Sequence, residues 1–196
     1  MQKLFFLLLI TTCTQVFAQD SLNSFNYSRN NITKTGMKVL GSWGVANLGV
    51  GAIGWASANN KTDKYFYRMS TFWGAVNTGV AVLGFTGAKR NMKQQLNSTD
   101  NLKAQQTIER TFLINGGLDL AYIGTGIYLN GRGNKREDEK LKGYGSSMIM
   151  QGIFLLLFDG TMYTIQRTNG NKLRNFLEKN PITFTGNSIG IVYNIR

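Results

Sequence analysis

The chain has 196 residues, of which 42% are hydrophobic, and this is enough for one domain with a sizeable core. It carries 22 basic and 10 acidic residues, a formal net charge of +12, no histidine and one cysteine. This composition excludes Ser-His-Asp catalysis, histidine-based metal sites and disulfides within the chain. We therefore expect no metal, no cofactor and no enzymatic activity.

Residues 1–18 have the order of a secretory signal peptide. A basic start at Lys3 is followed by an apolar run, Leu4 to Ile10, and by the small-residue motif Val16-Phe17-Ala18. The apolar run is too short to cross a bilayer by itself. Cleavage after Ala18 would remove Cys13 and leave no thiol in the mature chain. An uncleaved anchor and a first strand are the alternatives for this stretch.

Residues 19–31 are polar and rich in Asn and Ser, which predicts a flexible N-terminus. Residues 32–168 then contain four apolar spans, each of about 19 residues, which is close to the length that crosses ~30 Å of hydrocarbon. Caps and turns separate the spans, so each one is predicted to be a helix. The predicted helices end near Ala58, Ala88, Leu129 and Ile165.

Residues 169–196 are predicted to form a separate tail. Asn169-Gly170-Asn171 is expected to end the fourth helix, and residues 172–179 to form one short amphipathic helix. Beyond Pro181, two apolar runs on either side of Gly186-Asn187-Ser188 predict a β-hairpin.

The first two spans repeat one pattern 30 residues apart. Trp43-Gly44-x-x-Asn47 returns as Trp73-Gly74-x-x-Asn77, and small residues follow in each copy at helical spacing. Such a stripe lets two membrane helices approach closely, because small residues bring the backbones into contact. The predicted packing residues are Gly44, Gly51, Gly54, Gly74, Ala81 and Gly84. The same faces also predict a homo-oligomer.

One polar residue lies near the middle of each span. These residues are Asn47, Asn77, Asp119 and Asp159, and Tyr122 and Tyr163 are near the two aspartates. Polar groups at this depth of a bilayer must face other helices or water. They are expected to join the helices by hydrogen bonds, and the alternative is a site for a proton, a cation or a small polar ligand.

These features favour an all-α, four-helix transmembrane bundle made of two helical hairpins, with a short C-terminal β-hairpin. Basic residues between the spans are suited to lipid headgroups, and no motif for nucleic-acid binding accompanies them. A soluble periplasmic bundle is an alternative, because the mean hydropathy is slightly negative. A β-barrel is disfavoured, because its spans would alternate between polar and apolar residues.

The signal peptide and the two Trp-Gly-x-x-Asn spans resemble a family of small bacterial membrane proteins of unknown function. The resemblance implies export, four helices and a β-like tail, and it implies no activity. A structural or accessory role in the cell membrane is expected, and a small transporter or channel-like protein is the alternative. A cleaved signal places both termini outside, whereas the basic loops favour the opposite orientation.

Overall fold

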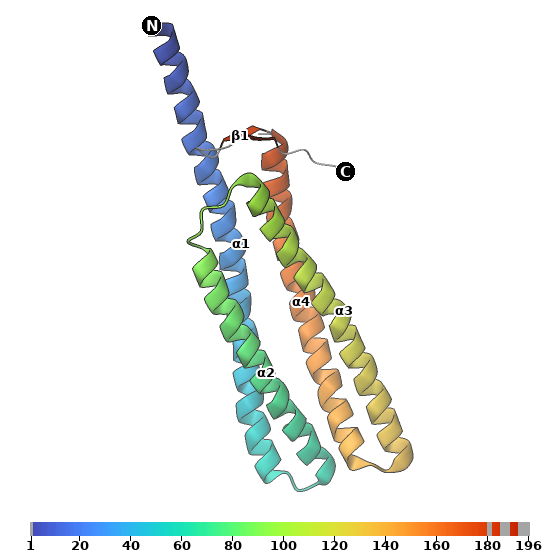
Figure 1. Cartoon of the computed structure of the whole chain (residues 1–196). Coiled ribbons are helices and arrows are strands. Elements are labelled where there is room, and N and C mark those ends of the chain that lie inside the picture. Colours follow the sequence, from blue (N-terminus) through green and yellow to red (C-terminus); the bar gives the residue numbers. More distant parts are fainter. Residues whose placement is uncertain (1, 180–181, 185–188, 192–196) are drawn as a thin grey trace.

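The computed structural model describes the backbone of residues 2–179, 182–184 and 189–191, and the side chains of residues 20–179. Two helical hairpins lie side by side and form one elongated bundle (Figure 1). The helices are α1 Gln2–Ser57, α2 Lys61–Asn91, α3 Ser98–Arg136 and α4 Glu139–Lys179. The prediction of a four-helix bundle made of two hairpins is therefore confirmed.

Two three-residue strands follow the bundle. β1 Ile182–Phe184 pairs antiparallel with β2 Ile189–Ile191, and Thr183 lies opposite Gly190. These strands occupy the two arms of the predicted hairpin. Its predicted turn, 186–188, lies outside the described residues.

Asparagine and aspartate side chains cap the N-termini of three helices, α2, α3 and α4. Asn60 accepts a hydrogen bond from the backbone N–H of Asp63 at 2.7 Å, and Asn97 accepts one from that of Asp100 at 2.8 Å. Asp138 accepts hydrogen bonds from the backbone N–H groups of Lys140 and Leu141, the second and third residues of α4. Each side chain satisfies donors that have no partner inside the helix.

The predicted flexible N-terminus is wrong. Residues 19–31 belong to α1, where Leu22 and Asn26 are buried. The Asn26 side chain donates hydrogen bonds to the carbonyl oxygens of Asn91 and Gln94, at 2.9 and 2.7 Å. These contacts with the end of α2 and the loop after it explain why residues 19–31 are polar, because buried amides need hydrogen-bond partners.

Two predicted helix ends are also wrong, because both Asn-Gly sequences continue as helix. α3 passes through residues 130–134, where the Asn130 side chain donates to Ser146 Oγ at 2.8 Å across the hairpin. α4 passes through residues 169–171, so no separate tail helix forms. There the Asn169 side chain donates to Gln105 Oε1 at 3.1 Å. Tertiary contacts override the local preference for a turn at both places.

Small residues bring α1 and α2 into backbone contact. A Cβ atom on Gly74 would lie 2.6 Å from the backbone nitrogen of Leu48 and 2.8 Å from the carbonyl oxygen of Gly44. The other predicted packing residues also face the opposite helix of this hairpin: Gly51 meets Thr71, Gly54 meets Tyr67, Gly84 meets Met37 and Ala81 meets Gly41. In the second hairpin, Gly126 and Gly145 make the same kind of contact.

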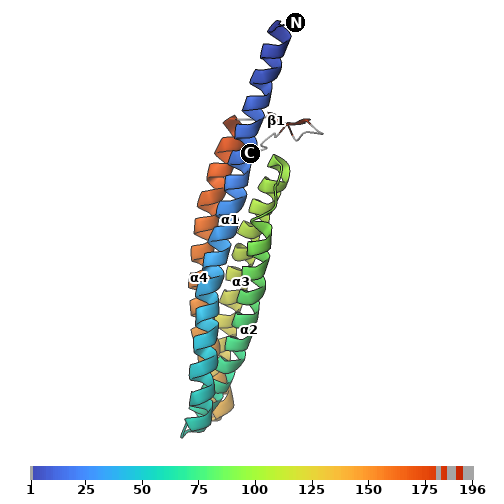
Figure 2. The same cartoon turned by 90° about the vertical axis from the view of Figure 1, so that its left-hand side faces the viewer.

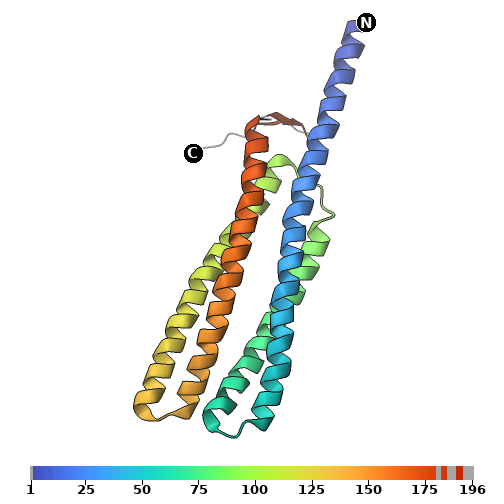
Figure 3. The same ribbon diagram turned by 180° about the vertical axis from the view of Figure 1, so that it is seen from behind.

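The two hairpins pack unevenly against each other. α4 contacts both α1 and α2, whereas α3 packs mainly on α4 (Figures 2 and 3). Among the described helices, the backbones of α2 and α3 are not closely packed, and the two helices meet through side chains such as Trp73 and Tyr122. The apolar core lies where the four helices converge and is formed by Met37, Leu40, Trp73, Ala81, Phe112, Leu155 and Met162.

Substituting Gly74 by valine tests the close contact within the first hairpin. The new side chain must displace the α1 backbone, so we expect a loss of about 1–3 kcal/mol in the free energy of unfolding. The matched control is Gly79→Val, because a Cβ atom at Gly79 meets nothing within 4 Å. Unfolding by denaturant in detergent measures both variants, and equal stabilities would contradict the packing described for Gly74.

Candidate functional site

The four polar mid-span residues are all buried, and they form two adjacent groups. In the first group, Asn47 Oδ1 accepts a hydrogen bond from Gln151 Nε2 at 2.6 Å, and Asn77 Nδ2 donates to Gln151 Oε1 at 3.5 Å. In the second group, the carboxyl groups of Asp119 and Asp159 interact directly. These contacts bring all four residues to one level of the bundle.

Gln151 joins the first group, and the sequence analysis did not identify it. Its side chain has no exposed surface, and its Oε1 also accepts a hydrogen bond from Trp43 Nε1 at 2.8 Å. Trp43 in turn stacks on Phe154, with ring centroids 4.1 Å apart. Spacing could have revealed this residue, because Gln151 lies two helical turns before Asp159 on the same face of α4. The partners within this group satisfy one another, which supports a structural role.

The second group borders a cavity of about 180 Å³ that is lined by residues of all four helices. Asn115, one turn before Asp119, interacts with the carboxyl group of Asp159. Two buried polar atoms of residues that line the cavity, Asp119 Oδ2 and Trp73 Nε1, have no hydrogen-bond partner. The cavity is lined by Met37, Leu40, Trp73, Val76, Asn77, Val80, Phe112, Asn115, Leu118, Asp119, Tyr122, Leu155, Phe158 and Asp159.

The structure separates the two predicted tyrosines. Tyr122 lines the cavity and packs edge-on against Trp73, with ring centroids 5.0 Å apart. Tyr163 is half-buried against the apolar core and is not part of the cavity wall. The candidate site therefore contains Asp119, Asp159 and Tyr122, with Asn77 at its edge.

A second polar network, which the sequence analysis missed, occupies one end of the bundle. We call this the polar end: residues 20–33, 92–110 and 166–179. Its centre is the buried Arg29, which donates to Asn101 Oδ1 at 2.8 Å and to Asn26. Burial lowers the pKa of Arg29 to about 10, so its guanidinium stays charged at neutral pH. Gln166 donates to the Arg29 carbonyl oxygen at 3.0 Å and connects α4 to α1.

Glu109 is the buried anion of the polar end. Its carboxylate lies 2.9 Å from Arg167 and 3.2 Å from Arg174, and it also accepts a hydrogen bond from Gln105 at 3.1 Å. A Cβ atom on Gly170 would overlap the Glu109 carboxylate, so a larger residue there would have to displace this side chain. The charges of the polar end therefore hold α1, α3 and α4 together. The carboxyl pair beside the cavity differs from these groups, because Asp119 Oδ2 has no hydrogen-bond partner.

The pattern of side chains does not resemble a metal centre. Within the part of the chain that the structure describes, no three His, Cys, Asp or Glu side chains are close enough to hold a metal ion. What the cavity offers is a pair of carboxyl groups, one free indole N–H and four aromatic side chains. This combination is suited to binding a small molecule by charge and ring contacts.

Comparison with known proteins gives one family match. A family of unknown function, DUF6992, matches residues 39–160. This range covers more than half of the chain and contains both Trp-Gly-x-x-Asn copies and all four polar mid-span residues. No curated protein and no solved structure is significantly similar to the chain. The chain therefore belongs to the family of unknown function DUF6992.

Proposed function

We propose that this protein is an integral membrane protein with a non-enzymatic, structural or accessory role. The observation that carries the proposal is a belt of four helical segments that are almost free of charge: 39–60, 69–88, 111–131 and 143–166. Asp119 and Asp159 are the only charged residue types in the belt, and a Lys or Arg flanks every segment on both sides. About 20 helical residues rise ~30 Å, the thickness of the hydrocarbon core.

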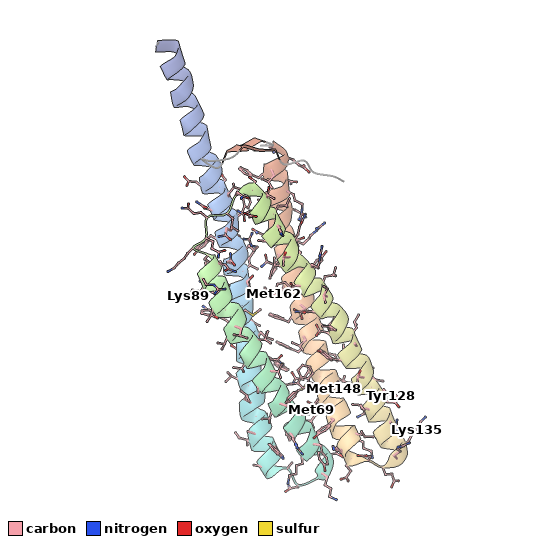
Figure 4. All side chains as sticks on the ribbon, in the orientation of Figure 1. Met69, Lys89, Tyr128, Lys135, Met148 and Met162 are labelled. Atoms are coloured by element: carbon pink, nitrogen blue, oxygen red, sulfur yellow. The ribbon has the colours of Figure 1, made fainter. Side chains whose placement is uncertain are left out.

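Within this belt the bundle exposes large apolar side chains and buries several polar ones beside its apolar core. Leu83, Ile53 and Leu157 expose 74, 71 and 67% of their surface, whereas Gln151 and Ser147 expose none. A helix in water buries its apolar face instead. In Figure 4, the labelled Lys89 and Lys135 lie on opposite sides of Met69 and Met148, which belong to the belt. This distribution supports a lipid environment around the middle of the bundle.

Hydropathy supports two of the four crossings. By length and composition, the part of α1 at Asp20–Ser57 and the whole of α4 are apolar enough to cross a membrane. The sequence predicts four helices of this kind. The other two helices are diluted by the polar residues that they turn inward, such as Asn77 and Asn115. Their outward faces are apolar, with Val80 and Leu120 half exposed or more.

The apolar belt, the signal peptide and the basic residues also bear on the partners of the protein and on its orientation in the membrane. We propose membrane lipid as the principal partner, and export directed by residues 1–18. The signal peptide would place the polar end outside, and the basic residues of that end oppose this orientation. The predicted packing glycines already contact the opposite helix of the first hairpin. A homo-oligomer would therefore use glycines that face outward, such as Gly79 and Gly117.

Alkaline carbonate washing of membranes from cells that express the full chain tests this proposal. An integral bundle stays in the pellet, because its apolar belt has no stable place in water. A peripheral membrane protein serves as the control and moves to the supernatant. Release of this protein with the control would favour the soluble periplasmic bundle and would overturn the proposal.

The second candidate is a small transporter or channel-like protein. The observation that favours it is the cavity at the level of Asp119 and Asp159, since ionisable groups at this depth are expensive to bury and usually mark a pathway. In this case the two carboxyl groups would bind the transported proton or cation.

Proteoliposomes separate the second candidate from a structural role. If the carboxyl pair transports, the wild-type protein conducts protons or cations, and Asp119→Asn and Asp159→Asn each lower the flux at least tenfold while folded yield is kept. A loss of folded yield in the variants, with no flux in the wild type, would exclude transport and leave the structural role.

A further inference from the structure

We infer that the cavity beside Asp119 and Asp159 binds a small lipid-soluble amine in its protonated form, which enters from the bilayer between α2 and α3. This inference rests on the proposed membrane embedding. It goes further because it assigns a ligand class and an entry route. Three observations support it: the carboxyl pair, the aromatic wall and the apolar mouth of the cavity.

The carboxyl pair attracts positive charge. Asp119 and Asp159 interact directly, and the four belt segments contain no Lys or Arg. Two carboxylates this close in hydrocarbon cannot both remain charged unless a proton or another cation lies with them. Asp119 Oδ2 is buried without a hydrogen-bond partner, so the pair has an acceptor free for a donor from a ligand. An ammonium group supplies both the charge and the donor.

The cavity wall is suited to an organic cation. Trp73, Phe112, Tyr122 and Phe158 all line it, and aromatic faces attract ammonium groups within about 6 Å. Its volume of about 180 Å³ is close to the ~150 Å³ cavity that accepts benzene. One aromatic ring therefore fits inside, with a short amine arm reaching the carboxyl pair. The free Trp73 N–H adds one donor for an oxygen atom on the ligand.

The mouth of the cavity favours entry from lipid. The backbones of α2 and α3 are not closely packed, although the Trp73 and Tyr122 side chains meet between them. Three apolar residues of these helices line the cavity and are also exposed on the surface: Val76, Val80 and Leu118, at 38, 50 and 49%. A hydrated metal ion would have to lose its water at this apolar rim, at high cost. An amine with an apolar body partitions into the bilayer and can pass this apolar rim.

Binding of radiolabelled phenethylamine to the full chain in lipid nanodiscs tests the inference, with empty nanodiscs as background. We expect saturable binding that weakens at least tenfold in Asp119→Asn and in Asp159→Asn. Asp20→Asn is the matched control, because it removes an exposed carboxylate far from the cavity and should leave affinity unchanged. Leu118→Trp keeps both carboxyl groups but fills the mouth, and it should weaken binding to a similar degree.

Competitors define the ligand class. Unlabelled propylbenzene, which has the shape of phenethylamine without the charge, should not displace it, and sodium ions at the same concentration should not displace it either. Undiminished binding in both aspartate variants, displacement by propylbenzene or displacement by sodium would each overturn the inference. These outcomes concern only the cavity, because carbonate washing tests membrane embedding separately.

Discussion

The proposed membrane embedding depends on one constraint: in hydrocarbon, a polar group needs its partner inside the protein. Side chains from different helices meet this constraint in the belt, and Gln151 of α4 bonds to residues of both α1 and α2. In the proposed lipid environment, which offers no hydrogen bonds, these contacts hold the helices in register. The polar end uses the same solution with charges, centred on Arg29 and Glu109.

Small residues set the distances at which these bonds form. Gly44 and Gly74 let the backbones of α1 and α2 meet, and Gly126 and Gly145 do the same for α3 and α4. With each hairpin closed in this way, α4 becomes the helix that joins the two, and α3 meets α2 through side chains such as Tyr122 rather than through close backbone packing. The cavity beside Asp119 lies where side chains of all four helices converge.

The sequence predicted the helices and the hairpins well, because apolar periodicity and small-residue spacing are local signals. It failed where tertiary partners decide the outcome. Asn26 and Asn169 have the composition of flexible or turn segments, yet both are buried with partners from other helices. Among the site residues, depth could be counted from the span ends, so the common level of Asp119 and Asp159 was predictable. The cavity was not, since it depends on how far α3 stands from α2.

The central claim is that the belt faces lipid rather than water. The most direct measurement places single spin labels on cysteines introduced into a chain without Cys13, in liposomes, and compares their collisions with oxygen and with a water-soluble nickel complex. Labels at Ile53, Leu83 and Leu157 should collide often with oxygen and rarely with nickel, and labels at Lys64 and Lys103 should do the reverse. Free access of nickel to the three belt positions would contradict the account.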